Sequence, residues 1–305
     1  MERYASLLER FFIVFVLAVA VLGVVLHSPG RVVASHQGVE IALAVLVATT
    51  GLSLQLDRLV AVKSSLVRIG LTVLGSSIAL PAISFLSAQL VTSPHLRYGI
   101  LAAGVAPAEV ASVALCSLAG GEAAITASIL ILTTVLTVFI SGPILVLEGA
   151  HVTGSSTSLL VNLALVVGAP LLIGIGIQIK WHLEKTGLAM VRITAVLSLL
   201  VLIWLVASQV VLNRAYLQVT VALLAYLAGS ALLGVLLSLR LPRSKRRAIM
   251  LPVTMRDFAI AAGVAAAAFG PAAAAPLGAY GVAVLLFGAA IAAYRPGRSN
   301  SAPLE

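Results

Sequence analysis

The chain has few of the residues that cover the surface of most soluble proteins. Only 10% of its 305 residues are charged and 5% are aromatic, whereas 61% are hydrophobic. One soluble core cannot bury that much apolar surface, so the composition indicates a polytopic membrane protein whose partner is the lipid bilayer. A single cysteine, Cys116, excludes an intramolecular disulfide.

Several functional motifs are also missing. The chain contains no H-E-x-x-H or other metal-ligand pair and no nucleotide-binding P-loop. These absences argue against a membrane-embedded enzyme and against ATP as the direct energy source. The net charge is +9, but the basic residues occur in short runs between apolar segments. No aromatic or basic-stripe pattern accompanies them, so we expect no nucleic-acid partner.

The apolar runs predict an all-α polytopic membrane protein with ten transmembrane helices in a single transporter domain. Each run is long enough for a hydrocarbon core of about 30 Å. No small-residue cleavage site follows the first run, so it is interpreted as a spanning helix and not as a removable signal peptide. A monomer is one expected oligomeric state, and the sequence leaves this state open. The predicted spans fall near residues 11–26, 39–54, 69–90, 98–119, 123–147, 159–179, 193–212, 218–239, 249–269 and 277–294.

The distribution of lysine and arginine predicts the orientation. With a cytoplasmic N-terminus, fifteen of the nineteen basic residues fall on the inner side, three fall outside and one, Arg256, lies within a span. Under the positive-inside rule this predicts a cell-membrane protein with both termini cytoplasmic. On the same topology, four histidines are expected in outward loops: His27, His36, His95 and His151.

Two of the predicted spans contain an interruption. Pro107 lies well inside the fourth apolar run and Pro252 inside the ninth, and each is followed by small residues and a glycine turn. Ten spans divide into inverted repeats of five, residues 11–147 and 159–294, which places the interruptions at corresponding positions. Paired interruptions of this kind are typical of a transporter substrate site. Two unrelated proline kinks are the alternative.

The fourth-span run APAEVASVALCSLAGGEAA (106–124) resembles the fourth-helix signature of the bile acid:sodium symporter family. The chain thus resembles a prokaryotic member of the bile, arsenite and riboflavin transporter superfamily. The stretch MRDFAIA (255–261) resembles that family's second crossing motif. The resemblance implies ten helices, with a panel from spans 1, 2, 6 and 7 and a core from spans 3–5 and 8–10. It also implies broken helices 4 and 9 that cross at the substrate and ion sites, and transport of organic anions by alternating access.

Within that resemblance, several sodium-ligand positions carry unusual residues here. Ser112 and Thr126 match hydroxyl ligands, and Ser76 falls where the family has a glutamine. The remaining positions carry Val113, Leu130, Pro252 and Arg256. An arginine has only hydrogen-bond donors and cannot ligate sodium, so the family's double-sodium site does not carry over intact.

Acidic residues are scarce, and only Glu109 and Asp257 of the ten lie within apolar runs. A charge at the centre of a bilayer helix costs roughly 2.5 to 3.5 kcal/mol, and such residues usually line a transport path. We predict that Glu109, Arg256 and Asp257 meet where the broken helices cross. Arg256 would bind an anionic substrate, and a carboxylate would hold a proton or one Na+.

The sequence prediction therefore assigns two overlapping groups of residues and no cofactor beyond Na+ as a coupling ion. The substrate-binding residues are Arg256, Glu109, Asp257, Pro107 and Thr254. The ion-binding residues are Ser112, Thr126, Glu109, Asp257, Met255 and Ser76.

Other interpretations of these residues stay open. In one alternative, Arg256 and a carboxylate form a static ion pair that holds two helices together. In another, the side chain of Arg256 extends toward the membrane surface. The nine residues from Arg247, just before the predicted start of the span, to Arg256 correspond to about 13 Å of helix, which argues against the second alternative. The leading function is a secondary carrier for a small organic anion, coupled to Na+ or H+. An arsenite-efflux carrier is the runner-up, but the expected cysteine position is Ala108. A passive channel is the third interpretation.

Overall fold

The computed structural model describes residues 12–53, 65–147, 161, 165, 168–181, 185–208 and 214–293. Throughout these residues the chain is helical apart from turns, short connections and one isolated backbone bridge. The predicted cytoplasmic ends, residues 1–11 and 294–305, lie outside the described residues. The helices, in chain order, are α2 (Phe12–Val25), α3 (His27–Ser35), α4 (Gly38–Ser53), α6 (Leu66–Ala88), α7 (Pro94–Val105), α8 (Ala111–Leu118), α9 (Ala123–Leu147), α11 (Ala169–Trp181), α12 (Lys185–Ala207), α13 (Arg214–Leu237), α14 (Arg243–Thr254), α15 (Phe258–Phe269) and α16 (Pro271–Ala293).

Within the described residues, five helices are long and apolar enough to cross a membrane. They comprise most or all of α6, α9, α12, α13 and α16. Shorter apolar helices occupy Ile41–Ser53, Ala169–Trp181 and Phe258–Phe269. Many large apolar side chains face outward, including Leu147 at 85% exposure and Val67 at 80%. An all-helical, multi-pass membrane protein accounts for both features, because lipid rather than water covers such side chains.

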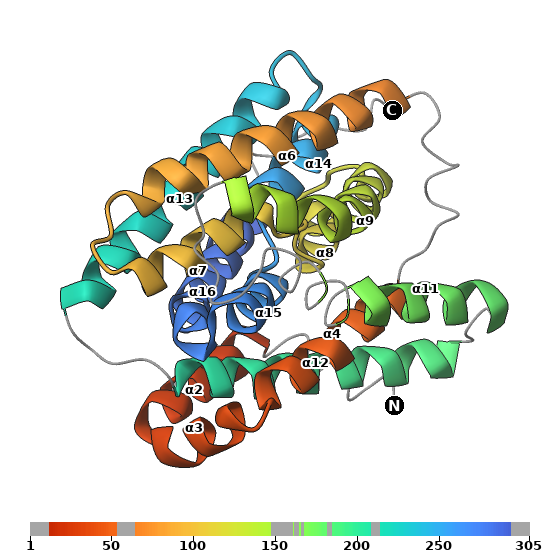
Figure 1. Cartoon of the computed structure of the whole chain (residues 1–305). Helices are drawn as coiled ribbons and strands as arrows, with labels where there is room; N and C mark the ends of the chain where they lie inside the picture. Colours follow the sequence, from red (N-terminus) through yellow and green to blue (C-terminus); the bar gives the residue numbers. More distant parts are fainter. Residues whose placement is uncertain are drawn as a thin grey trace, which may run out of the picture.

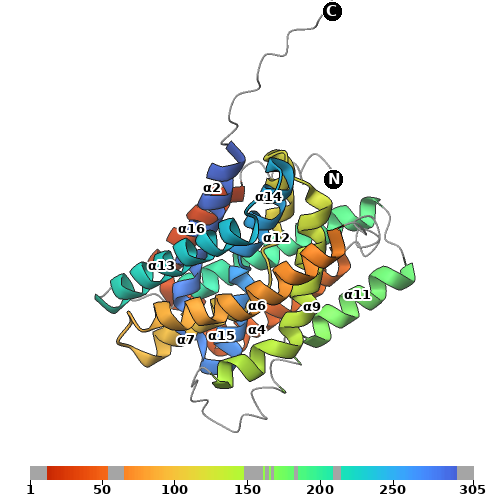
Figure 2. The ribbon, with the colours of Figure 1, turned by 90° about the horizontal axis from the view of Figure 1, so that it is seen from above.

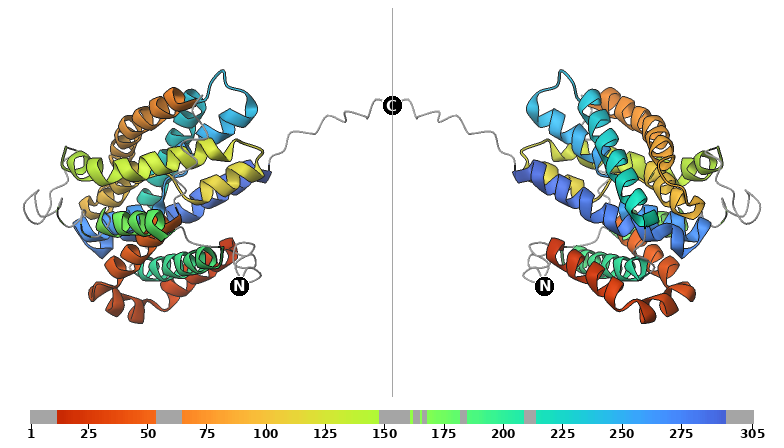
Figure 3. Two further views of the ribbon diagram at one scale, coloured as in Figure 1. Left: turned by 90° about the vertical axis from the view of Figure 1, so that its right-hand side faces the viewer. Right: turned by 90° about the vertical axis from the view of Figure 1, so that its left-hand side faces the viewer.

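The helices form two groups. Figures 1 and 3 show α2, α3, α4 and α12 as a layer along one side of the molecule, and α11 continues this layer by packing against α4. The other group contains α6 to α9 and α13 to α16, and Figure 2 shows it from above. The groups meet where α15 and α16 pack against α4 and α12. The predicted panel and core would contain the same helices as these two groups. Their identity as separate domains of a transporter stays a prediction.

Most predicted span positions agree with a helix. The fifth span, 123–147, coincides with α9 at both ends. One difference concerns the outward loops, because His27 begins α3 and His95 is the second residue of α7. The run HSPGRVVAS is amphipathic and short, so a search for long apolar runs cannot find this helix. His151 lies outside the described residues.

Glycine permits the closest contact within the first layer, between α4 and α11. A Cβ atom on Gly174 would lie 2.3 Å from the carbonyl oxygen of Ala48 and 3.1 Å from Cα of Gly51. A Cβ on Gly51 would lie 2.5 Å from the carbonyl oxygen of Leu171. Small residues that let two backbones meet in this way are a common basis of helix association in membranes.

We therefore expect Gly174→Ala to separate α4 from α11 and to destabilise the protein by about 1–3 kcal/mol. The thermal unfolding midpoint of the detergent-purified protein measures this effect. Gly176→Ala is the matched control, because a Cβ there meets nothing within 4 Å. Equal midpoints for the two variants would show that this backbone contact does not stabilise the layer.

Candidate functional site

The first interruption lies between α7 and α8. Helix α7 ends at Val105, and Ala106 is extended, with ψ 153°. Ala106 precedes Pro107, and the residue before a proline is sterically disfavoured in the helical conformation. The chain becomes helical again at Ala111. Four consecutive residues from Ala106 to Glu109 are buried, so the interruption lies inside the protein.

The second interruption lies between α14 and α15, but it does not occur at Pro252 as predicted. Pro252 is still helical, and the helix ends at Thr254, after which Met255 and Asp257 are extended. Pro252 has no N–H and so cannot donate to the carbonyl of Ala248, four residues earlier. The hydroxyl of Thr126 on α9 donates to this carbonyl at 3.0 Å. A neighbouring helix thus satisfies the freed acceptor, which allows one further helical turn.

The two interruptions cross each other as a short antiparallel bridge. Ala108 pairs with Arg256. The amide N–H of Glu109 donates to the carbonyl of Met255 at 2.8 Å, and the amide N–H of Asp257 donates to the carbonyl of Pro107 at 2.9 Å. These bonds satisfy backbone groups that the helix breaks expose, which is required within a membrane.

Hydroxyl groups on neighbouring helices satisfy further backbone atoms at the crossing. Thr133 accepts from the amide N–H of Ala108 at 3.2 Å, and Thr137 donates to the carbonyl of Val105 at 3.2 Å. On α13 the hydroxyl of Ser230 lies 2.8 Å from the carbonyl of Leu227 in its own helix and 3.3 Å from the carbonyl of Thr254, so the two carbonyls share its one proton. These side chains maintain the interrupted backbone, so they are structural groups of the site.

Asp257 caps α15. Its Oδ1 accepts hydrogen bonds from the amide N–H groups of Ala259 at 3.0 Å and Ile260 at 2.8 Å. A carboxylate at this position also interacts favourably with the positive end of the helix dipole. The intramembrane charge of Asp257 is therefore stabilised by the start of its own helix.

Glu109 has weaker partners. Its side chain is 7% exposed, and Oε1 lies 3.5 Å from the amide nitrogen of Ala111 at the start of α8. Oε2 is buried without a hydrogen-bond partner in the described part of the chain. Ser112, the next polar residue of α8, likewise has a buried Oγ without a partner. The segment from Ala106 to Ser112, called the first crossing segment, therefore presents two oxygen atoms without hydrogen-bond partners among the described residues.

Arg256 is the most enclosed charge of the site, with 2% of its surface exposed. Its Nε and Nη1 are buried and have no hydrogen-bond partner among the described residues. A bidentate pair with a carboxylate would occupy at least one of these atoms, so Arg256 is not fixed in such a pair with Glu109 or Asp257. Arg256 also does not extend to the membrane surface, because its backbone lies in the crossing and its side chain is enclosed.

The remaining predicted residues occupy different environments. Thr254 is the last residue of α14, and its Oγ1 is buried without a hydrogen-bond partner among the described residues. The carbonyls of Pro107 and Met255 accept the backbone N–H groups of Asp257 and Glu109. Thr126 donates to Ala248. Ser76 on α6 donates to the carbonyl of Val73 at 3.1 Å, within its own helix. The structure thus joins Glu109, Arg256, Asp257, Pro107 and Met255 at the crossing and gives Ser76 and Thr126 helix-supporting bonds.

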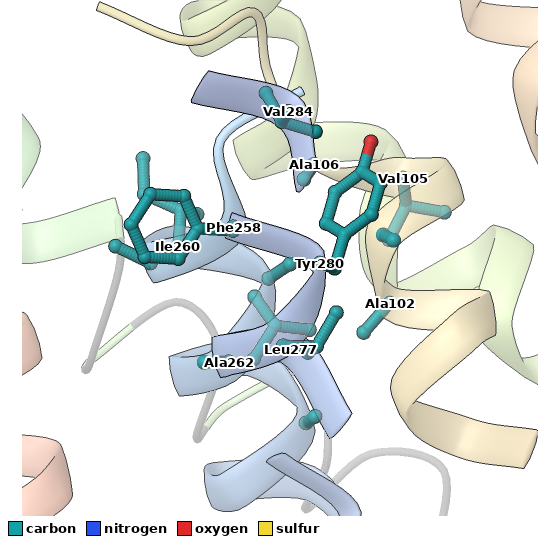
Figure 4. Packing of buried hydrophobic residues seen from close by; sticks show 14 of the residues in the cluster. Ala102, Val105, Ala106, Phe258, Ile260, Ala262, Leu277, Tyr280 and Val284 are labelled. Atoms are coloured by element: carbon teal, nitrogen blue, oxygen red, sulfur yellow. The ribbon is translucent and has the colours of Figure 1, made fainter. Parts of the chain in front are cut away.

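Two tyrosines near the site were not found from the sequence. Tyr226 on α13 and Tyr280 on α16 both lie near Arg256. Their ring centroids are 5.7 Å apart, and Tyr226 donates to the carbonyl of Ala103 at 3.0 Å. Figure 4 shows Tyr280 between α16 and α7, beside Val105 and Ala102. Tyrosine is enriched at membrane interfaces. The positions of Tyr226 and Tyr280 inside apolar runs were therefore the sequence signal that could have marked these two residues as part of the site.

Cys116 does not lie at the crossing. It is buried near the end of α8, where its carbonyl accepts from the amide N–H of Gly121 at 2.8 Å. A Cβ on Gly121 would lie 2.5 Å from Cys116 Sγ. The thiol therefore packs against the α8–α9 turn, and this position does not favour the arsenite alternative.

The fold is that of an all-helical membrane protein in which the connection between α7 and α8 and that between α14 and α15 pair with each other beside buried charged residues. The model of the sodium bile acid symporter family matches residues 40–220. This match covers more than half of the chain, so the chain belongs to this family. The matched segment includes the first crossing segment and ends before Arg256. No curated protein matches the chain.

The bond between Thr126 and Ala248 supports the delayed break in α14. We expect Thr126→Val to leave the Ala248 carbonyl without a partner and to cost about 1–3 kcal/mol, the typical penalty for a buried unsatisfied polar group. The thermal unfolding midpoint should fall accordingly. Thr220→Val is the control, because the Thr220 hydroxyl is exposed and bonds only within α13. A midpoint no lower than that of the control would contradict the role of this bond.

Proposed function

We propose that the chain is a secondary carrier that moves a small organic anion across the cell membrane by alternating access. The observation that carries this proposal is the buried Arg256, whose guanidinium has unpaired nitrogens at the crossing of two interrupted helices. Intramembrane charges of this kind usually mark substrate paths. Membership in a family of transporters supports the same function.

The proposal includes ten spans arranged as inverted repeats. The spans correspond to α2, α4, α6, α7–α8, α9, α11, α12, α13, α14–α15 and α16. At 1.5 Å per residue, α7 and α8 together extend about 30 Å, and α14 and α15 about 36 Å. Each interrupted pair is therefore long enough to cross a hydrocarbon core of about 30 Å. In this arrangement the crossing lies near the middle of the bilayer, and both termini are cytoplasmic.

The chemistry of the crossing supports an anionic substrate. Arg256 supplies unused N–H donors that carry a positive charge, and a guanidinium binds carboxylate and similar anions well. The helices α8 and α15 both begin beside the crossing, and a helix start favours negative charge. Glu109, Thr254 and Ser112 add polar atoms without partners, which would contact the polar part of the substrate or a coupling ion.

The contact between the two helix groups supports alternating access. Next to the start of α15 a small apolar hollow is lined by Leu202, Ile203 and Val206 of α12, by Phe258, Ala259 and Ala262 of α15, and by Gly278 of α16. The residues that line this hollow are apolar, so rocking of one group against the other would open the crossing to one side of the membrane at a time.

We expect a substrate anion to raise the thermal unfolding midpoint of the purified protein, because a ligand that binds only the folded state stabilises it. Carboxylates, keto acids, sulfated steroids and arsenite form the test panel. Arg256→Gln should abolish the shift, whereas Arg247→Gln should keep it, because Arg247 donates instead to the carbonyl of Ala119 at the end of α8. A shift that survives Arg256→Gln would remove Arg256 from the substrate site.

Counterflow in proteoliposomes then separates a carrier from a channel. A carrier exchanges external labelled anion for internal unlabelled anion through its alternating site, so the label accumulates transiently. A passive channel shows no such accumulation, and that result would contradict the proposed mechanism.

Coupling to Na+ or H+ is the part of the proposal that depends on the carboxylates. Glu109→Gln or Asp257→Asn should remove the ion dependence of uptake, because each keeps the shape of the side chain but loses its charge. Glu122→Gln is the control, since Glu122 accepts from Ser244 at the α8–α9 turn. Unchanged ion dependence in both site variants would exclude Glu109 and Asp257 as coupling groups.

A further inference from the structure

We infer that Arg256 is a built-in cation that replaces a bound sodium ion at the crossing, so that this family member binds its anion without sodium. The inference rests on the proposed carrier function and specifies its coupling. It departs from the sodium named in the family description, and it depends on residues beyond the matched segment.

The charge of Arg256 is the first argument. A guanidinium stays protonated in proteins, and this one is 98% enclosed at the crossing. A second monovalent cation placed beside it would be repelled in a region where water does not screen the charges. Arg256 is itself paired to Ala108 through its backbone, so the guanidinium is attached to the crossing and cannot leave as a bound ion does.

The oxygen atoms of the crossing are the second argument, because a hard cation needs several oxygen ligands at once. The carbonyls of Met255 and Pro107 already accept N–H groups across the bridge. Asp257 Oδ1 accepts two amide N–H groups of α15. The hydroxyl protons of Thr126 and Ser76 are directed to helix carbonyls.

Among the predicted ion-binding residues, Glu109 Oε2 and Ser112 Oγ are buried and have no hydrogen-bond partner in the described part of the chain. The hydroxyls of Thr126 and Ser76 keep their acceptor lone pairs, because only their protons are donated. Arg256 stands where the family resemblance implies a sodium ligand and has only donors, so the residues of this chain do not fit sodium at that position. The crossing suits a different arrangement, in which Asp257 beside Arg256 balances the guanidinium. The substrate anion then meets the N–H groups of Arg256 that have no partner among the described residues.

Sodium alone is the probe for the first experiment. The thermal midpoint of the purified full-length protein is measured in rising NaCl and in choline chloride of equal ionic strength. For the wild type we expect the same midpoint in both salts. A sodium-specific rise of several degrees in the wild type would overturn the inference.

Arg256→Gln tests whether the arginine is the reason. This variant leaves the two carboxylates without their cation and adds an amide oxygen, so we expect a sodium-specific rise that the wild type lacks. Arg256→Lys should remain insensitive to sodium, because it keeps the charge. Arg247→Gln loses the same charge away from the crossing and should also remain insensitive. If Arg256→Gln gains no sodium response, the replacement of sodium by Arg256 is wrong.

Binding of the substrate anion separates this inference from the carrier proposal and does not require that Arg256→Gln folds. The anion identified by the thermal screen is titrated into the wild type in sodium and in choline. Equal affinity in both salts supports the inference, and a tenfold or greater loss in choline overturns it while the carrier proposal stands. If no organic anion binds in either salt, both the carrier proposal and the inference that rests on it fail.

Discussion

The structure depends on two backbone hydrogen bonds that join the interrupted helices. Glu109 donates to Met255 and Asp257 donates to Pro107, each at less than 3.0 Å. A helix that stops inside a membrane exposes N–H and C=O groups that lipid cannot satisfy. Each interruption therefore satisfies one backbone N–H and one backbone carbonyl of the crossing. The crossing is also what brings two carboxylates and a guanidinium together.

The surrounding helices form hydrogen bonds to backbone N–H and C=O groups of the crossing that have no backbone partner. Thr133 and Thr137 of α9 bond the first interruption, and Ser230 of α13 bonds the second. Thr126 compensates for the missing N–H of Pro252. Small hydroxyl side chains suit this task, because they reach a neighbouring backbone without separating the helices. With the backbone satisfied, the unused polar atoms are concentrated on Arg256, Glu109, Ser112, Thr254 and Tyr280.

The three charges differ in how they are stabilised, and this difference suggests different roles. Asp257 Oδ1 is held by the N–H groups at the start of α15. Among the described residues, Arg256 has donors without partners and Glu109 has an acceptor without a partner. Buried polar groups are normally satisfied, and exceptions often mark function. The unpartnered atoms of Arg256 and Glu109 are therefore the first candidates to contact a substrate or a coupling ion.

Much of the fold followed from apolar run length alone. The bounds of α9 were predicted from the sequence at both ends, and the interruption at Pro107 was found because a proline restricts the residue before it. The break at Pro252 was placed too early, since the prediction could not know that Thr126 would satisfy the freed carbonyl. Tyr226 and Tyr280 were missed because their role depends on packing around Arg256, which no periodicity reveals.

The sequence by itself determined that the chain is a multi-pass helical membrane protein, because so many apolar residues in long runs can be buried only in lipid. It also showed which charged residues fall inside such runs, namely Glu109, Arg256 and Asp257, and their depth in the membrane stays a prediction. Only the tertiary structure decided that these charges meet, which of their atoms lack partners and which hydroxyls are committed to the backbone. Those facts depend on contacts between different helices, and the two bonds of the crossing join residues more than a hundred positions apart, so local sequence does not encode them.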